Sequence, residues 1–253
     1  MVVHSDSLPI SAVIIVRDAE QTIGKTLESL RWFDEVIVYD NGSTDRTLEI
    51  IGSFPNVSLH EGEFLGFGPT KNHAAGLARH DWVLLVDSDE SVSDELFTSI
   101  AAAALSDSKT AYSVLRANYF RGKHVRHSGW GADWLVRLYH RGGTQVSDIS
   151  VHEVVLPPSG GRVVRLRGEL SHDAVRELSE FLVKIDRYSE IRRNGDWSIR
   201  SPAMAFLSSF WAFVRSYILK LGFLDGWRGL VIAVCDANGV FFKYLKPYAD
   251  NHD

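Results

Sequence analysis

The stretch WVLLVDSDE at residues 82–90 decides the fold of this chain. Five apolar residues run without interruption and are followed at once by two carboxylates, Asp87 and Asp89. A short continuous apolar run is typical of a strand that is buried on both faces of a parallel sheet. In such sheets ligands bind beyond the carboxyl ends of the strands, so the two carboxylates are predicted to lie at a binding edge.

The residues before this stretch repeat the same alternation. Buried strands are predicted at 10–16 and 36–39 and a short third strand at 57–59. Helices are predicted at 23–30, 48–51 and 72–77. Strands that alternate with helices predict βαβ units and a mostly parallel, Rossmann-like α/β sheet. Asp18 and Asp40 follow the first two strands as Asp87 follows the fourth. We therefore expect three acidic side chains to converge on one edge of the sheet.

After about residue 110 the pattern changes. Shorter, partly alternating strands are predicted at 111–115, 134–139, 151–156 and 162–170, and helices at 175–193, 202–221 and 230–245. The division that follows is an α/β domain over residues 1–173, with halves at 1–105 and 106–173, and a helical region over 174–253.

Charge and targeting signals limit the classes of function. The net charge of −5 over 253 residues argues against binding of nucleic acid, which needs an excess of Lys and Arg. The lone Cys235 fits a reducing compartment, and the first residues lack the pattern of a signal peptide. The longest apolar stretch, 201–214, is shorter than the ~20 residues that a bilayer requires. We expect a cytoplasmic protein.

Two acidic motifs carry most of the chemistry. Two carboxylates one residue apart, Asp87 and Asp89, suit a hard divalent cation that keeps open positions for phosphate oxygens; the alternative is a turn that caps the helix after Ser93. Asp40 could accept hydrogen bonds from a base or a ribose, and neither a turn nor a helix cap needs an acid at that position. The residues that follow it, 43–45, suit a helix cap.

Four stretches together resemble the nucleotide-sugar half of glycosyltransferase family 2. They lie in the matching order at 13–20, 40–45, 66–72 and 82–90. The resemblance implies a GT-A fold, an inverting mechanism, Mg²⁺ or Mn²⁺ as cofactor, and Asp89 as a ligand of that metal. It also implies that the nucleotide sugar is bound by Val16, Asp18, Glu20, Asp40, Lys71, Asp87 and Ser88.

Five later motifs resemble the bacterial lipopolysaccharide-core β-1,4-glucosyltransferases, which add glucose to the first heptose of the inner core. These motifs lie at 118–122, 127–130, 137–139, 151–153 and 222–226. The resemblance implies UDP-glucose as the donor and a lipid A-core heptose as the acceptor. It assigns residues 1–105 to the nucleotide-sugar half and 106–173 to the acceptor half.

Inversion requires a general base on the face of the sugar opposite the leaving diphosphate. Glu153 is the first choice, Asp133 the second and Asp148 the third; a solvated strand-end carboxylate is the alternative reading of Glu153. The resemblance to GT-A enzymes implies that His172 completes the metal shell, and imidazole is an acceptable ligand of Mn²⁺; the alternative is that His172 caps a helix that begins near Asp173.

The remaining candidates would contact the acceptor or the diphosphate. His127, Trp130 and His152 are predicted to line the acceptor pocket, although Trp130 equally fits an ordinary core. Arg137 lies among apolar strand residues, where a buried guanidinium needs an anionic partner, either a diphosphate or a carboxylate.

Aromatic and basic residues alternate in the last third of the chain, as in helices that lie in a membrane interface. The competing reading is a hairpin packed on the catalytic domain or on a second subunit of a homodimer. We favour a peripheral protein on the inner face of the cytoplasmic membrane. A nucleotidyltransferase is disfavoured because residues 16–20 contain no glycine, and an inactive scaffold because every acidic position is present.

Overall fold

The computed structural model describes residues 8–148, 154–193 and 201–252, and the chain divides into two compact units. The first comprises residues 1–116 and 133–172, and the second residues 117–132 and 173–253. The sequence-based division kept residues 106–173 together, whereas the structure groups 117–132 with the C-terminal helices. The reason is a contact between distant parts of the chain, because the short turn at 128–130 packs on the last helix.

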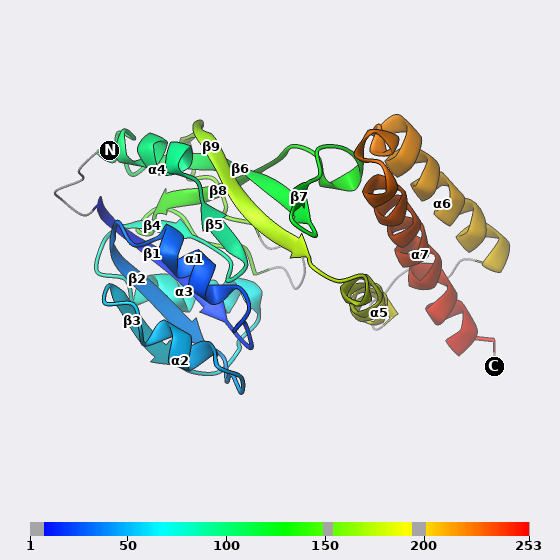
Figure 1. Ribbon diagram of the computed structural model, residues 1–253, viewed down its shortest axis with the longest axis horizontal. Helices are drawn as coiled ribbons and strands as arrows, with labels where there is room; N and C mark the ends of the chain where they lie inside the picture. Colours follow the sequence, from blue (N-terminus) through cyan, green and yellow to red (C-terminus); the bar gives the residue numbers. More distant parts are fainter. Residues whose placement is uncertain (1–7, 149–153, 194–200, 253) are drawn as a thin grey trace. The chain divides into compact units, whose positions relative to one another are not determined.

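The first unit is built on a mixed sheet (Figure 1). Its parallel part has the order β3-β2-β1-β4, formed by β1 (Leu8–Val16), β2 (Phe33–Asp40), β3 (Val57–Glu61) and β4 (Trp82–Leu85). The sheet then continues in the order β8-β6-β9-β5, formed by β5 (Glu90–Val92), β6 (Thr110–Phe120), β8 (Asp133–His140) and β9 (Arg162–Val175). The pairs β4–β8, β6–β8 and β5–β9 are antiparallel, and β6 and β9 run from the first unit into the second. The parallel strands and the helices between them form the Rossmann-like α/β arrangement that the sequence predicts.

Both faces of β1, β2 and β4 are buried, which confirms their apolar runs as central strands, whereas β3 at the end of the sheet order is only partly buried. On one face Ile14 packs with apolar residues of α1 (Ile23–Ser29) and α4 (Asp94–Ala101). On the other face Val13 packs with alanines of α3 (Phe67–Gly76). Neighbouring residues of one strand thus serve two separate clusters. A further helix, α2 (Thr47–Ile51), lies between β2 and β3 along the chain.

Several elements differ from the prediction. Residues 151–153 of the strand predicted at 151–156 lie outside the described residues, and Val155 makes only an isolated bridge with Val146. The strand predicted at 162–170 continues to Val175, so the following helix, α5 (Ser179–Arg193), begins later than expected. The three-residue strand β5 was not predicted.

The second unit contains α5, α6 (Pro202–Val214) and α7 (Trp227–Asp250), with β7 (Lys123–His124) paired to β6. The helix predicted at 202–221 is interrupted: α6 is followed by a π-helical turn, η2 (Arg215–Leu219), and Leu221 is left-handed with φ 57°. Two short 3₁₀ turns complete the unit, η1 (Ser128–Trp130) and η3 (Gly222–Asp225). A small core forms around Phe120, Val125, Val175, Phe181 and Ile232. No helix in the described part of the chain combines the length and the apolar content that crossing a membrane requires.

Candidate active site

The three acidic residues predicted to converge do follow three neighbouring strands. β1 pairs in parallel with β2 on one side and with β4 on the other. Val16 at the end of β1 is in register with Asp40 at the end of β2. The loops after these strands therefore meet at one edge of the sheet, where ligands bind in open α/β sheets.

Asp18 joins the loop after β1 to the loop after β2. The backbone N–H of Thr44 donates to Asp18 Oδ1 over 2.7 Å, and the backbone N–H of Asp18 donates to Ser43 Oγ over 3.0 Å. Asp18 itself has a left-handed backbone, with φ 50°. The hydrogen bond from the Thr44 amide is the main cause of a lowered pKa at Asp18, so this carboxylate is ionised at neutral pH.

Glu20 makes a second reciprocal pair of hydrogen bonds between the same two loops. Its backbone N–H donates to Asp45 Oδ2 over 3.0 Å, and its own Oε2 accepts the N–H of Arg46 over 3.2 Å. Between these pairs, the N–H of Ala19 donates to Thr47 Oγ1 over 2.8 Å. Segments 17–20 and 43–47 therefore hold each other through reciprocal hydrogen bonds.

Asp40 is 1% exposed, and its carboxylate is engaged by its own loop. Oδ2 accepts the N–H groups of Gly42 (2.8 Å) and Ser43 (2.9 Å), and Oδ1 accepts the Ser43 hydroxyl. The inference that the turn does not need an acid at this position was wrong, since both oxygens stabilise the turn. Gly42 has φ 88°, a conformation that favours glycine.

Val16 contributes its side chain to the core rather than to the edge. It is buried in the cluster on the α1 face of the sheet, and its carbonyl accepts the N–H of Asn41 over 2.9 Å. Its backbone thus helps to set the path of the loop after β2.

Asp87 lies between two buried cations. Lys71 Nζ, from α3, is 2.7 Å from Asp87 Oδ1, and Arg137 Nη2, from β8, is 2.8 Å from Oδ2. Burial alone would raise the pKa of Asp87, but Arg137 and Lys71 hold this pKa well below its usual range. Arg137 was predicted to need a diphosphate or a carboxylate, and within the described residues it binds carboxylates.

Glu90 was not predicted as a site residue, yet it is 0% exposed at the centre of this arrangement. Its Oε2 accepts the backbone N–H of Asp87 over 2.9 Å, and Oε1 accepts Arg137 Nη2 over 2.8 Å. Burial is the main cause of a raised pKa at Glu90, which Arg137 partly counteracts. The sequence contained a signal for the pair of Glu90 and Arg137. Arg137 was predicted to need an anionic partner, and Glu90 is the acid that directly follows the Asp87-Ser88-Asp89 triplet.

Arg116 extends the alternation of charges to Asp133. Its Nη1 is 3.7 Å from Glu90 Oε1, while its Nε and Nη2 donate to Asp133 Oδ2 over 3.0 and 2.7 Å. The two residues are cross-strand partners in β6 and β8. Asp133 Oδ2 is thus occupied by two donors of Arg116, and an acceptor hydroxyl would have to compete with them for this oxygen.

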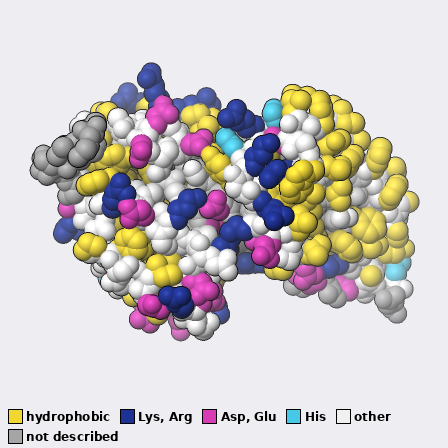
Figure 2. Space-filling model, viewed as in Figure 1, with side chains coloured by type: hydrophobic (Ala, Val, Ile, Leu, Met, Phe, Trp, Pro, Cys, Tyr) yellow, Lys and Arg dark blue, Asp and Glu magenta, His cyan; other side chains and the backbone are white. Residues whose placement is uncertain are grey.

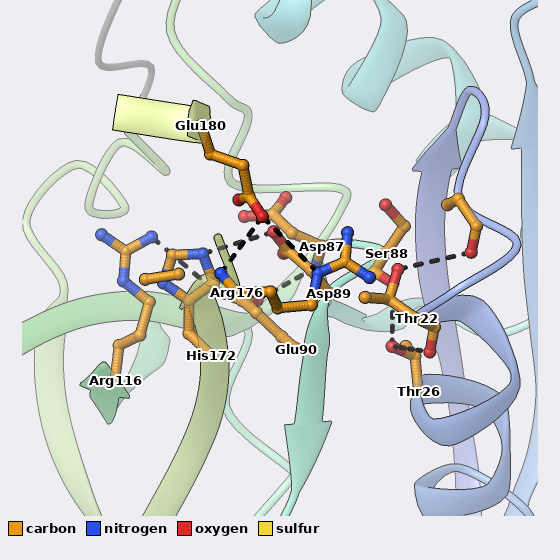
Figure 3. A network of polar contacts seen from close by, with 12 residues as sticks. Thr22, Thr26, Asp87, Ser88, Asp89, Glu90, Arg116, His172, Arg176 and Glu180 are labelled. Carbon is orange, nitrogen blue, oxygen red and sulfur yellow. Dashed lines mark hydrogen bonds and ion pairs between the residues drawn. The ribbon is translucent and has the colours of Figure 1, made fainter. Parts of the chain in front are cut away.

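Asp89 and His172, the two residues predicted to bind the metal, lie close together. Asp89 Oδ2 and His172 Nε2 are 3.4 Å apart (Figure 3), and the Asp89 side chain is 38% exposed. β9 continues past His172, so this histidine is a strand residue and not a helix cap. A carboxylate and an imidazole suit Mn²⁺, with positions left over for phosphate oxygens. No group of three or more potential metal ligands occurs among the residues that the structure covers.

Ser88 is held from its backbone. The hydroxyl of Thr26 in α1 donates to the Ser88 carbonyl over 3.0 Å (Figure 3). The Asp87 N–H also donates to Glu90 Oε2, so the backbone of the DSD triplet is held by two hydrogen bonds, at Asp87 and at Ser88.

Of the predicted acceptor residues and general bases, some lie outside the described residues and others belong to the second unit. Glu153 and His152 lie outside the described residues, and Asp148 is exposed in a loop. His127 belongs to the second unit, where its N–H and Nδ1 lie 2.9 and 3.2 Å from the carboxylate oxygens of Asp225.

Trp130 also belongs to the second unit. Its ring stacks on Phe181, with centroids 5.7 Å apart, and packs against the small core. The alternative reading of Trp130 as an ordinary core residue therefore describes its surroundings.

Comparison with known proteins gives one family and several relatives. The model of Glycosyl transferase family 2 matches residues 11–165, and the GT-A fold implied by the resemblance is thereby confirmed. The chain is 28% identical to the lipopolysaccharide core biosynthesis glycosyltransferase LpsC of Rhizobium meliloti (strain 1021), over 95% of this chain and 92% of that protein. It is 34% identical to an uncharacterized glycosyltransferase of Rickettsia bellii (strain RML369-C), over 94% and 85%. Among solved structures, S. aureus TarS 1–349 in complex with UDP-GlcNAc aligns over 96% of this chain and 92% of that one, with TM-score 0.47 and 16% identity.

Proposed function

This chain belongs to glycosyltransferase family 2, and from that membership we propose that it is a metal-dependent, inverting hexosyltransferase. The proposed donor is UDP-glucose, and the proposed acceptor is an inner-core heptose of lipopolysaccharide or lipooligosaccharide. The similarity to LpsC, named for lipopolysaccharide core biosynthesis, supports this acceptor class. The observation that carries the chemistry is the 3.4 Å pair of Asp89 and His172, directly after the buried ion pairs of Asp87.

In this proposal Asp89 and His172 would hold a divalent cation, which would supply positive charge to the diphosphate of the leaving UDP. Asp87 stays ionised between Lys71 and Arg137. Each of its oxygens binds one cation, and its remaining lone pairs would accept hydrogen bonds from the nucleoside. The N–H groups of the two linked loops shape the edge on which the nucleotide lies. The backbone bonds to Asp87 and Ser88 keep the triplet in place without rearrangement.

Glu153 is the proposed general base. It would take the proton from the acceptor hydroxyl as that oxygen attacks the anomeric carbon from the face opposite UDP, which inverts the configuration. The pairing of Asp133 with Arg116 supports Glu153 over this fallback, because Asp133 Oδ2 already accepts two hydrogen bonds from the guanidinium.

The test uses UDP-glucose, Mn²⁺ and a heptose-terminated lipid A-core acceptor, with transfer followed by mass spectrometry. Asp89→Asn should abolish the Mn²⁺-dependent transfer, and Glu153→Gln should lower turnover by roughly 10²–10⁴-fold while UDP affinity stays the same. Asp81→Asn, an exchange at an exposed carboxylate in another part of the first unit, is the matched control. Full activity of the Asp89 variant would overturn the metal assignment.

Donor and acceptor have competing assignments within the same family. Another nucleotide sugar, or a capsule, other glycan or protein acceptor, would leave the same site intact. A thermal-shift screen of nucleotide sugars with and without Mn²⁺ separates these, since the true donor stabilises the folded state by mass action. Release of pyrophosphate from UTP and a sugar phosphate would indicate a nucleotidyltransferase, and absence of any UDP release would indicate a scaffold.

The proposal also includes a place of action at the inner face of the cytoplasmic membrane, where a lipid-linked acceptor is exposed. A homodimer is the competing explanation of the C-terminal helices.

A further inference from the structure

The second unit exposes an unusually apolar surface. Large hydrophobic side chains gather over α6, the turns that follow it and the start of α7 (Figure 2). Phe206 is 63% exposed and Trp211 57%. The members of this apolar face are Met204, Phe206, Leu207, Phe210, Trp211, Ile218, Leu219, Leu221, Phe223, Leu224, Trp227, Leu230 and Val234.

The apolar face follows from how the helices pack. α6 and α7 lie against each other, and the Ser209 hydroxyl donates to the Ala237 carbonyl over 2.8 Å. Small residues, Ala205 and Ala212 of α6, are buried, which leaves the bulky residues of α6 on the solvent side. Large hydrophobic residues scattered singly on a surface are normal, whereas a contiguous set marks a binding surface.

Basic residues accompany the apolar face, with almost no acids. Segments 117–132 and 201–234 contain six Lys and Arg residues against one acidic residue, Asp225, in a chain whose net charge is −5. Asp225 is bound to His127. The next acid along the chain, Asp236, is half-buried and accepts the Ser216 hydroxyl over 2.8 Å. The basic residues of this group are Arg121, Lys123, Arg126, Arg215, Lys220 and Arg228.

We propose that the apolar face binds the surface of an anionic lipid bilayer, with its aromatic and aliphatic side chains in the headgroup boundary and the basic residues near lipid phosphates. Exposed tryptophans such as Trp211 and Trp227 are of the type that prefers this boundary. Apolar burial and attraction of Lys and Arg to anionic lipids act together in interfacial helices. The inference deepens the proposed function by naming the lipid class that recruits the enzyme.

Charge distinguishes a bilayer from a second copy of the chain. A two-fold dimer places the same patch on both partners, so basic residues around the apolar face would oppose one another. Like charges across an interface disfavour association. An anionic bilayer complements both the apolar face and the basic residues that accompany it.

Co-sedimentation of the full chain with vesicles tests the proposal. Vesicles of phosphatidylcholine alone are compared with vesicles that contain about one third phosphatidylglycerol. We expect strong binding to the anionic vesicles and binding to the neutral ones that is weaker by more than about 25-fold, the effect of only two basic residues at about 1 kcal/mol each. Raising the salt from ~0.1 M to ~1 M shortens the Debye length from about 10 to about 3 Å and should remove most of the difference.

Two variants assign the binding to the apolar face and to its charges. Phe206→Ser with Phe210→Ser should weaken binding on the order of 100-fold, since each phenyl ring loses its burial. Lys123→Gln with Arg126→Gln should weaken binding to anionic vesicles about 25-fold, at about fivefold per charge, and leave binding to neutral vesicles unchanged. Trp32→Ser, at an exposed aromatic residue of the first unit, is the matched control and should bind as the unchanged chain does.

Equal binding to both vesicle types, or no loss in the Lys123/Arg126 variant, would overturn the proposal. So would a dimer in sedimentation equilibrium that Phe206→Ser and Phe210→Ser dissociate without any vesicle binding. The charge variant keeps the test valid if the phenylalanine variant fails to fold. The vesicles contain neither donor nor glycan, so vesicle binding and glucosyl transfer are measured independently. If the unchanged chain transfers glucose but does not bind vesicles, only this inference is refuted. If it binds anionic vesicles but transfers no sugar, only the proposed function is refuted.

Discussion

Replacing Arg137 with methionine should destabilise the first unit by roughly 3 kcal/mol. Arg137 Nη2 binds Asp87 and Glu90 at 2.8 Å each, and Glu90 is fully buried. Removing one partner of a buried ion pair typically costs about 3–5 kcal/mol, because an uncompensated charge remains. We take the lower end of that range because Lys71 still faces Asp87, and Arg116 lies 3.7 Å from Glu90.

Thermal unfolding of a double-mutant cycle measures this coupling. Arg137→Met should lower the melting temperature by roughly 6–12 °C, and adding Glu90→Gln should recover part of the loss because the uncompensated charge is gone. Arg46→Met, at an exposed pair with Glu49, is the control, with a loss of at most about 1 kcal/mol. Effects of Arg137→Met and Glu90→Gln that add within about 0.5 kcal/mol would refute the reasoning.

The pH dependence of the same variant has a definite sign. In the unchanged chain the lowered pKa of Asp87 gives stability above the unfolded pKa that is lost at acid pH, whereas the raised pKa of Glu90 favours the folded state below its unfolded pKa. Loss of Arg137 raises both pKa values in the folded variant. The stability difference between variant and unchanged chain should therefore shrink as the pH falls from neutral towards the ordinary carboxyl range.

Two further predictions concern the second unit. Gly229→Ala should destabilise it by at least about 2 kcal/mol, because a Cβ there would lie 1.8 Å from the Gly222 carbonyl oxygen. Gly239→Ala is the control in the same helix: its Cβ meets nothing within 4 Å, and the variant should be more stable by about 0.5–1 kcal/mol. Equal melting temperatures of the two variants would contradict the packing of α7. Asp225→Ala should cost about 1–3 kcal/mol because it leaves the amide and imidazole of His127 without their acceptor, and an unchanged thermal melt would show that this contact does not stabilise the turn.

The parallel half of the sheet was predictable because its signal is local. The apolar runs that became β1, β2 and β4 need both faces covered wherever they lie, and an acid after each of them meets the others through topology alone. Asp89 and His172 were paired from the resemblance, and their 3.4 Å approach depends on a strand pairing that no local pattern contains.

Strand β5 shows why the remainder was missed. Residues 90–92 read as the approach to a helix cap, and Ser93 does cap α4 by accepting the N–H of Leu96. They become a strand only because β9, almost eighty residues later, pairs with them. The role of Glu90 depends on the same distant partners, since Arg137 and Arg116 arrive on other strands. The carboxylate of Asp40 was misjudged for the opposite reason, because its bonds are local but depend on the exact turn.

The reciprocal bonds between segments 17–20 and 43–47 have a consequence for evolution and engineering. Each segment supplies N–H donors to the other and carboxylate or hydroxyl acceptors in return. A chimera that exchanges one segment alone leaves unmatched donors and acceptors on both sides. The two segments should therefore be inherited, and grafted, as a single cassette, although almost two dozen residues of chain separate them.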